Sequence, residues 1–213
     1  MLKAIIFDMD GVLIDSMPYH ADSWISAFNK VGISATREDI YSMEGSNSKG
    51  MVKKIFSKNK RIPEENHYRE LPVIKREIFF KIKEIKTFDE IYPCLNLLKN
   101  KYKLAVVSGS DQKTVTSIID RIFPEIFEVV ITGSDVNEGK PSAEPYLNAI
   151  RKLNVKADES IVIENAPFGV EAAKNAGIYC IAIPTYIDSN QLKKADLILE
   201  NHSALKEYFK KLI

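Results

Sequence analysis

Short apolar runs alternate with amphipathic segments along most of this chain. The runs, each about the length of a β-strand, lie at residues 4–7, 104–107, 129–131, 161–163, 178–183 and 197–199. The segments between the later runs place apolar residues at helical spacing, as in Val115, Ile118 and Ile122. Because strands that are apolar on both faces are typical of parallel sheets covered by helices, this alternation predicts an α/β fold with a mostly parallel sheet.

The stretch from residue 16 to residue 87 interrupts the alternation, because it contains no convincing strand and places its apolar residues at helical spacing. Its helix signals include Pro18, which suits a first helical turn, and Thr36 with Asp39, which resemble a capping box. Pro72 predicts that the last segment of this stretch is not one uninterrupted helix. We therefore expect consecutive amphipathic helices here.

This organisation predicts two domains. An α/β core is expected from residues 1–15 and 88–213, and an all-helical domain, inserted into it, from residues 16–87. Since no Gly/Ser linker separates the two parts, short hinges are expected near residues 15–17 and 85–89.

Amino-acid composition limits the kinds of partner and the cellular location that we expect. Thirty Lys and Arg against 29 Asp and Glu leave a formal charge of +1, so no strong overall field favours nucleic acid or an anionic membrane, and we expect neither as a partner. The N-terminal apolar run is too short for a signal peptide or a membrane span, which predicts a cytoplasmic protein. Cys94 and Cys180 lie among apolar neighbours and are expected to be buried, reduced thiols. Because no apolar stripe is left unassigned, we expect a monomer.

The first apolar run ends in two carboxylates, Asp8 and Asp10, which are followed by Gly11. Ligands of open parallel sheets bind at the carboxyl ends of the strands. Two acids separated by one residue can take different environments, one charged as a nucleophile or metal ligand and the other protonatable as a general acid or base. The alternative is an Asx turn that only caps the next segment.

Three later runs also lead into polar residues. Ser108 and Gly109 offer a hydroxyl and backbone donors to a phosphoryl oxygen, or else only begin a helix. Lys140, held before a proline, offers a charge that neutralises phosphate and carboxylate, or else is a surface turn residue. Glu164 and Asn165 carry oxygen ligands suited to Mg²⁺.

These segments, in this order, resemble the four motifs of the haloacid dehalogenase superfamily of phosphotransferases, over essentially the whole chain. The matching residues are Asp8-x-Asp10-Gly11-Val12, Ser108-Gly109-Ser110, Lys140-Pro141 and Glu164-Asn165-x-x-x-Gly169-Val170. The helical insert resembles the cap of the β-phosphoglucomutase-like branch. The resemblance implies a Rossmann-like parallel-sheet core with an inserted all-helical cap domain, Mg²⁺ as cofactor and a small phosphorylated substrate.

The resemblance also implies roles. Asp8 would be the nucleophile that forms an aspartyl-phosphate, and Asp10 would protonate the leaving oxygen and then activate water. The Asp8 side chain and the Asp10 backbone carbonyl would ligate the metal. Lys140 and Ser108 would bind and neutralise the transferred phosphoryl group, which agrees with the dependence of phosphoryl transfer on positioning and charge.

One position departs from the family pattern, which usually has Asp where this chain has Asn165. Glu44 lies in a cap loop that faces the active site in related proteins, so we expect it to approach Mg²⁺ when the cap closes. The alternative is that Glu44 is solvated and Asn165 ligates the metal alone through its amide oxygen.

Other cap residues are candidates for substrate contacts. Related phosphohydrolases that act on pyrophosphate or small sugar phosphates generally have Arg where this chain has Ser46. Lys49 and Lys75 are candidates to replace that cation, although each could instead be a solvated surface residue. His20 is expected to hydrogen-bond the hinge or the second acid, and Trp24, one turn further on, to pack in the core.

The sequence therefore predicts a Mg²⁺-dependent phosphohydrolase that acts on a small phosphorylated metabolite or inorganic pyrophosphate through an aspartyl-phosphate. A hexose-phosphate mutase similar to β-phosphoglucomutase is the second candidate, and the missing cap arginine and Asn165 count against it. A non-catalytic protein that binds a phosphorylated metabolite is the third.

Overall fold

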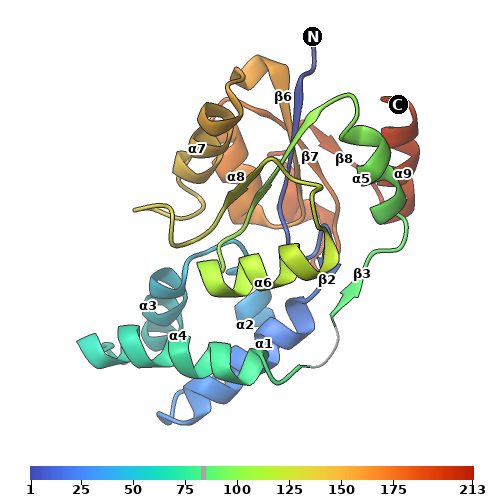
Figure 1. The fold of residues 1–213 in the computed structure, drawn as a ribbon. Helices are drawn as coiled ribbons and strands as arrows, with labels where there is room; N and C mark the ends of the chain where they lie inside the picture. Colours follow the sequence, from blue (N-terminus) through green and yellow to red (C-terminus); the bar gives the residue numbers. More distant parts are fainter. Residues whose placement is uncertain (83–84) are drawn as a thin grey trace.

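The computed structural model describes residues 1–82 and 85–213 and shows a six-stranded sheet covered by helices, with further helices at one end (Figure 1). Every neighbouring pair of strands in this sheet is parallel. The strand order is β5 (Val129–Ile131), β4 (Lys103–Val107), β1 (Ala4–Phe7), β6 (Ser160–Glu164), β7 (Tyr179–Ala182) and β8 (Leu197–Ile198). The predicted α/β fold with a parallel sheet is confirmed.

Helices cover both faces of the sheet. One face carries α5 (Tyr92–Leu98), α6 (Gln112–Ile122) and α9 (His202–Lys210), and the other carries α7 (Glu144–Leu153) and α8 (Pro167–Asn175). Short 3₁₀ turns, η1 (Ala157–Glu159) and η2 (Ser189–Leu192), complete the core.

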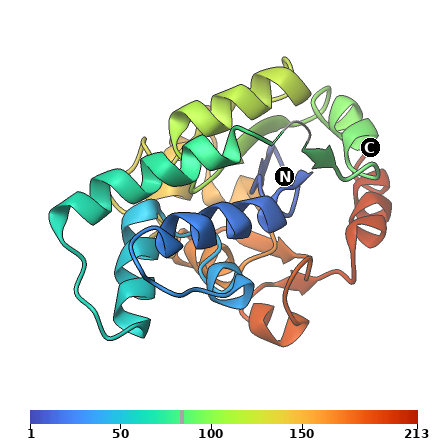
Figure 2. The ribbon, with the colours of Figure 1, turned by 90° about the horizontal axis from the view of Figure 1, so that it is seen from below.

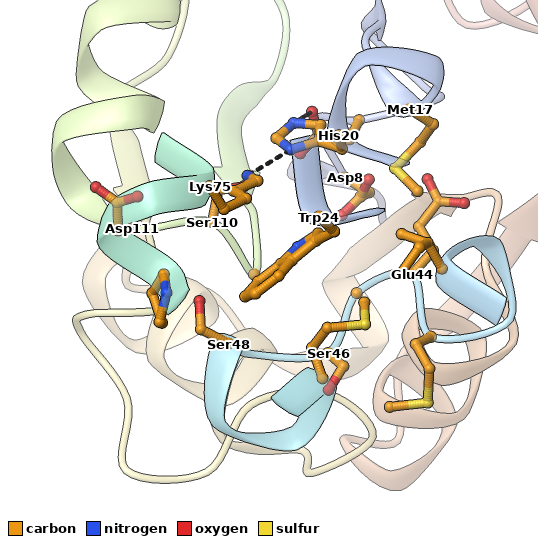
Figure 3. Close-up of a pocket in the computed structure, with 17 residues that line it drawn as sticks. Asp8, Met17, His20, Trp24, Glu44, Ser46, Ser48, Lys75, Ser110 and Asp111 are labelled. Atoms are coloured by element: carbon orange, nitrogen blue, oxygen red, sulfur yellow. Dashed lines mark hydrogen bonds and ion pairs between the residues drawn. The ribbon is translucent and has the colours of Figure 1, made fainter. Parts of the chain in front are cut away.

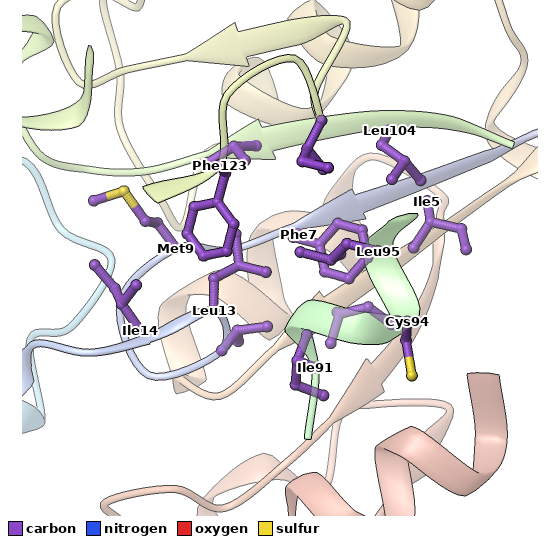
Figure 4. Close-up of a cluster of buried hydrophobic side chains, with 14 of the residues drawn as sticks. Ile5, Phe7, Met9, Leu13, Ile14, Ile91, Cys94, Leu95, Leu104 and Phe123 are labelled. Carbon is purple, nitrogen blue, oxygen red and sulfur yellow. The ribbon is translucent and has the colours of Figure 1, made fainter. Parts of the chain in front are cut away.

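The central strand β1 contributes to the apolar packing on both faces. Ile5 and Phe7 point into one cluster, part of which is shown in Figure 4, and Ala4 and Ile6 point into the other, because alternate side chains of a strand face opposite ways. All four residues are inaccessible to solvent. This burial fixes the direction of the strand, and with it the place where Asp8 leaves the sheet. The two cysteines are buried free thiols, as predicted.

Four helices lie between the first and second strands of the large sheet: α1 (Met17–Asn29), α2 (Arg37–Tyr41), α3 (Ser48–Lys58) and α4 (Glu65–Phe79). We call them the cap. They share an apolar cluster of their own, in which Trp24 stacks on Phe28 with ring centroids 5.3 Å apart. This separate cluster supports the expected inserted domain, whose limits at residues 16–87 stay a prediction. Residues 83–84, within that range, lie outside the described residues.

Two predictions from local sequence signals in the cap had different outcomes. Thr36 and Asp39 form the predicted capping box at the start of α2. The prediction that Pro72 interrupts the last helical segment was wrong, because α4 runs through it. Leu71 and Phe79, on either side of Pro72, are buried, and α4 lies alongside α1 (Figure 2), so tertiary packing outweighs the lost helical hydrogen bond.

The chain passes between the core and the cap through a two-stranded antiparallel ribbon. Its strands are β2 (Ile14–Asp15) and β3 (Lys86–Thr87), and the Phe88 backbone N–H donates to the Leu13 carbonyl at 3.3 Å. The sequence did not predict these strands, which are only two residues long. They lie at or next to both expected hinges. Among the described helices, none is long and apolar enough to cross a membrane.

Candidate active site at the carboxyl end of the sheet

Four of the sequence-predicted residues meet where β1, β4 and β6 end. Asp8 and Asp10 follow β1, Ser108 follows β4, and Asn165 follows β6, and all four are buried. Lys140, from the loop before α7, reaches the same place and is only 4% exposed. The structure thus gathers residues that are up to 157 positions apart (165 − 8) at one edge of the sheet, because parallel strands end at the same edge.

Lys140 is held between two carboxylates. Its ammonium group donates to Asp8, to Glu164 Oε1 at 2.6 Å and to the Val107 carbonyl at 3.3 Å. Burial disfavours the charged form of Lys140, but the charges of Asp8 and Glu164 outweigh burial and raise the pKa of Lys140 above its ordinary value. Lys140 is therefore a fixed cation directly beside Asp8.

Glu164 takes a different place from the one predicted. Its Oε1 accepts from Lys140 and from the Tyr146 hydroxyl at 2.8 Å, and its Oε2 accepts from the backbone N–H groups of Asn165 and Ala166. Four donors fill the acceptor sites of a carboxylate, so the prediction of Glu164 as a metal ligand is not supported. It anchors Lys140 instead. A Cβ at Gly169 would lie 1.6 Å from Glu164 Oε1, which explains the glycine at the start of α8.

Asp10 lies in a separate network with cap residues. Its carboxylate accepts from the Ser16 hydroxyl, from His20 Nε2 at 2.9 Å and from the Ser108 hydroxyl at 3.3 Å. Burial raises the pKa of Asp10, but the charge and hydrogen bond of His20, together with Ser16, outweigh it and lower the pKa to about 2. His20 is therefore placed at the second acid, one of the two partners expected from the sequence.

Lys75 completes this network from α4, with its ammonium group 2.7 Å from His20 Nδ1 (Figure 3). Lysine has only donors, so Nδ1 accepts and Nε2 is left to donate its N–H to Asp10. Burial and Lys75 lower the pKa of His20, and burial lowers the pKa of Lys75 to about 8. Both effects favour the neutral form of the ring, and the Lys75 contact selects the tautomer that carries its proton on Nε2.

Glu44 and Asn165 meet across the boundary between cap and core. Asn165 Nδ2 donates to Glu44 Oε1 at 2.8 Å, while Glu44 Oε2 and Asn165 Oδ1 are buried without a hydrogen-bond partner. Burial raises the pKa of Glu44 well above its ordinary value, and so does the charge of Asp8, against the hydrogen bond from Asn165. Two unsatisfied acceptor oxygens, buried beside two aspartates, form an environment that favours a cation.

A hard cation fits these donors. Over the described ranges 1–82 and 85–213, no three His, Cys, Asp or Glu side chains form a group that could hold a metal. The oxygens available here include an amide and a backbone carbonyl as well as carboxylates, and Mg²⁺ accepts all of these. The fit therefore depends on Asn165 and on the backbone of Asp10 beside the carboxylates of Asp8 and Glu44.

A small chamber of about 60 Å³ opens from the two aspartates toward the cap. That volume accommodates several water molecules, which limits what fits beyond a phosphoryl group. The cap wall combines apolar and polar side chains. Its apolar part includes Met17, Trp24, Ile40, Met43 and Met51, and its polar part is formed by His20, Glu44, Ser46, Ser48 and Lys75. In the view of Figure 3, Lys75 and Glu44 lie on opposite sides of the chamber with Trp24 between them. Trp24 thus both lines the chamber and packs in the cap cluster.

The other cap residues that were predicted to contact the substrate differ in whether they line the chamber. Lys75 is the only lysine or arginine among the described residues that line the chamber. Lys49 does not line the chamber. Its side chain is exposed and borders an adjoining surface groove that is also lined by Ser46 and Lys140, so its role as a substrate residue stays a prediction. Ser46, at the position where the resemblance led us to expect arginine, lines the chamber. Gly109 also lines it, and a Cβ there would lie 2.8 Å from the Gly45 carbonyl, so the cap loop rests directly on the core.

Sequence reasoning missed three contributors. Ser16 donates to Asp10, Tyr146 donates to Glu164, and Asp111 lines the chamber while its carboxylate accepts from the Thr114 N–H of α6. Tyr146 has the helical spacing of a core residue, and only its hydroxyl hinted at a polar partner. Ser16 lies within the expected hinge near residues 15–17, which was the one available signal for it.

Comparison with known proteins shows the family of the chain. The profile of the haloacid dehalogenase-like hydrolases matches residues 5–183, and the chain belongs to that family. Validoxylamine A 7'-phosphate phosphatase of Streptomyces hygroscopicus subsp. limoneus is 30% identical over 209 residues, which are 94% of each protein. Phosphorylated carbohydrates phosphatase of Thermotoga maritima is 30% identical over 181 residues, 83% of this chain and 82% of that protein.

The fold comparison points to the same branch. A solved structure of a provisionally named beta-phosphoglucomutase from Bacteroides vulgatus is 33% identical, with a TM-score of 0.92 over 99% of this chain and 88% of that one. CbbY from Rhodobacter sphaeroides, solved in complex with phosphate, is 26% identical, with a TM-score of 0.83 over 96% of each chain. The resemblance seen in the sequence motifs is confirmed.

Proposed function

We propose that the chain is a Mg²⁺-dependent phosphohydrolase that acts on a small phosphorylated metabolite or on inorganic pyrophosphate through an aspartyl-phosphate. The observation that carries this proposal is the buried contact of Lys140 with Asp8, beside a second aspartate that has its own partners. The phosphatases among the relatives support it, although their names state substrates of those proteins only. A monomer in the cytoplasm stays the expectation from the sequence.

In the first step, an oxygen of the Asp8 carboxylate attacks phosphorus, and the bond from phosphorus to the leaving oxygen breaks. Asp10 gives its proton to that oxygen. In the second step, water attacks the phosphorus of the aspartyl-phosphate, Asp10 takes the proton of the water, and the bond to Asp8 breaks. The products are inorganic phosphate and the leaving alcohol or phosphate, and both aspartates return to their starting state.

Asp10 needs different protonation states in these two steps. With a pKa lowered to about 2, Asp10 is ionised in the arrangement described, as water activation requires. Before the first step it must gain a proton, and the negative charge of a bound phosphoryl group favours that gain. His20 and Ser16 hold the carboxylate in one orientation throughout.

Lys140 and Ser108 are placed to hold the transferring phosphoryl group, one by charge and the other by its hydroxyl. Enzymes of this superfamily generally use Mg²⁺. Asp8, the Asp10 carbonyl, Asn165 Oδ1 and Glu44 Oε2 would hold the ion here. Bound there, Mg²⁺ would neutralise charge on the transferring group. The raised pKa values of Asp8 and Glu44, both due first to burial, agree with a site that favours an added cation.

The chamber favours a hydrolase over the alternative mutase. A mutase must bind a phosphate at both ends of a bisphosphate, yet Ser46 replaces the expected arginine and Lys49 lies outside the chamber. Lys75 is in contact with His20 and carries a pKa lowered to about 8. No second strong phosphate site is therefore present among the described lining residues.

A substrate panel tests the proposal. Pyrophosphate, hexose phosphates and nucleotides are assayed for phosphate release with Mg²⁺, using the wild type, Asp8→Asn and Asp10→Asn. We expect release from at least one small substrate, lost in Asp8→Asn. Release that survives this substitution would overturn the mechanism. Isomerisation of glucose 1-phosphate without release would select the mutase, and binding without either reaction would select the non-catalytic protein.

A further inference from the structure

The loop that follows β7 touches three separate parts of the molecule within two residues. The Thr185 hydroxyl donates to the Gly11 carbonyl at 2.7 Å, on the turn that follows the two aspartates. The Tyr186 hydroxyl donates to the Asp15 carboxylate, on hinge strand β2. The Tyr186 ring stacks on Tyr41 of cap helix α2, with ring centroids 5.5 Å apart and an interplanar angle of 25°. Core, hinge and cap therefore meet at Tyr186.

The cap side of this contact leads directly to the candidate metal site. The Glu44 backbone N–H donates to the Tyr41 carbonyl at 3.1 Å, so both residues belong to one turn. The Glu44 carboxylate then accepts from Asn165 of the core at 2.8 Å. A displacement of Tyr41 would move the turn that carries Glu44.

Tyr186 lies outside the chamber itself, because it is not among the described residues that line it. Any effect it has on the reaction must therefore pass through its neighbours. These are Tyr41, Asp15 and Gly11, where an added Cβ would lie 3.0 Å from the Tyr186 ring. Burial raises the pKa of Tyr186, and so does the hydrogen bond to Asp15, which keeps the phenol protonated as a donor.

A second contact between cap and core, made by a residue that lines the chamber, is weaker. Arg76 Nη1 of α4 lies 3.6 Å from Asp111 Oδ1 at the start of α6, and both side chains keep about a quarter to a third of their exposure. Exposed ion pairs are screened and contribute little. An aromatic stack, joined to a hydrogen bond at the hinge, holds two surfaces together more strongly.

We propose that Tyr186 is a positioning residue that holds the cap closed and keeps Glu44 over the active site. Its ring fixes the α2 turn and its hydroxyl fixes the hinge strand. The link to catalysis rests on the proposed function, whereas the link to cap closure does not. The two are therefore tested separately.

Trp24 provides a measurement of closure that needs no substrate. It is the single tryptophan of the chain, it lines the chamber, and it is 6% exposed. Quenching of its fluorescence by acrylamide reports how often the chamber opens. We compare the wild type with Tyr186→Ala, which removes both contacts, and Tyr186→Phe, which removes only the hydrogen bond. Tyr179→Ala is the matched control, because Tyr179 is an exposed tyrosine at the start of β7.

Tyr186→Ala is expected to lower the ratio of closed to open cap by about two- to tenfold, the effect of losing one aromatic stack, and to raise quenching accordingly. Tyr186→Phe should fall between Tyr186→Ala and the wild type, and Tyr179→Ala should match the wild type. In assays of phosphate release, Tyr186→Ala should raise KM and the Mg²⁺ concentration for half-maximal rate more than it lowers kcat.

If Tyr186→Ala folds poorly, a double-mutant cycle of Tyr41→Leu and Tyr186→Leu tests the proposal instead. The Tyr41→Leu variant should increase quenching, and adding Tyr186→Leu should then have a smaller effect than in the wild type. Unchanged quenching in folded Tyr186→Ala and Tyr41→Leu would overturn the proposal. Increased quenching in a protein without phosphatase activity would uphold this inference while contradicting the proposed function.

Discussion

The core and the cap contribute to the chamber in different ways. The core supplies closely paired charged groups, with Lys140 held by Asp8 and Glu164 at the end of the sheet. The cap supplies apolar side chains such as Trp24 beside polar groups, of which His20 and Glu44 reach core residues. The difference indicates that the core fixes the phosphoryl chemistry, while the cap limits the size of the substrate and completes the site on closing.

Breaking the charge pairing of the core should have the largest effect. Lys140→Met leaves Asp8 and Glu164 buried without their cation, so we expect a loss of at least about a thousandfold in kcat/KM. The free energy of unfolding should fall by about 3–5 kcal/mol, the cost of leaving a buried charge unpaired. Phosphate release and chemical denaturation measure the two effects.

Lys174→Met is the matched control for this substitution. Lys174 pairs with Asp196 at 2.6 Å, but its side chain is 35% exposed, so its loss should cost about 0–1 kcal/mol and leave activity unchanged. Equal destabilisation by the two variants would contradict the contrast between a buried and an exposed lysine.

The contribution of the cap to metal binding is tested next. Glu44→Gln keeps the shape of the side chain and removes its charge, so the Mg²⁺ concentration for half-maximal phosphate release should rise about 10- to 100-fold. Glu38→Gln, an exposed carboxylate on α2, should leave it unchanged. Direct titration with Mg²⁺ in the presence of phosphate should show the same order. If Glu44→Gln binds Mg²⁺ as the wild type does, Glu44 is not a ligand.

Substitutions of the two candidate lysines of the cap should have different effects on activity. Lys75→Met removes the partner of His20 Nδ1, so the ring is no longer held in one tautomer and kcat should fall about 10- to 100-fold. Lys49→Met removes an exposed side chain and should change neither kcat nor KM by more than about twofold. A loss in Lys49→Met as large as that in Lys75→Met would contradict the separation seen in the structure.

The last expected effect is on stability and not on activity, and it is a pH dependence. Burial lowers the pKa of Lys75 to about 8 from its ordinary 10.5, so between these values the unfolded chain binds a proton that the folded chain does not. The contribution of this group to stability therefore rises with pH across that window, by on the order of 3 kcal/mol. The difference in unfolding free energy between wild type and Lys75→Met should show this rise. Lys54→Met, at an exposed lysine of α3, is the matched control for the substitution itself.

Much of the core was predictable from the sequence, because each of its polar residues directly follows a buried strand or a recognisable motif. The position of Asp8 follows from the burial of β1, and the meeting of Ser108 with Asp10 follows from parallel strands ending at one edge. The sequence could not give the direction of the Glu164 side chain, which turns toward Lys140 and the start of α8. Neighbours in sequence can face opposite ways, so residue type alone did not separate a metal ligand from an anchor.

The cap was less predictable, since its contacts depend on how helices pack. The Pro72 prediction failed because packing against α1 outweighs a local preference. Lys49 and Lys75 look alike in the sequence, yet one is exposed and the other is buried beside His20. The stack of Tyr41 on Tyr186 joins residues 145 positions apart (186 − 41), and no motif marks either of them.

The central claim is that Asp8 carries the phosphoryl group. The most direct measurement is acid quenching of the enzyme during turnover of the substrate that the panel identifies, followed by mass spectrometry of its peptides. We predict phosphate on the peptide that contains Asp8, which should be absent from Asp8→Asn and should disappear when the substrate is exhausted. Phosphate on another residue, or turnover in Asp8→Asn at the wild-type rate, would contradict the account.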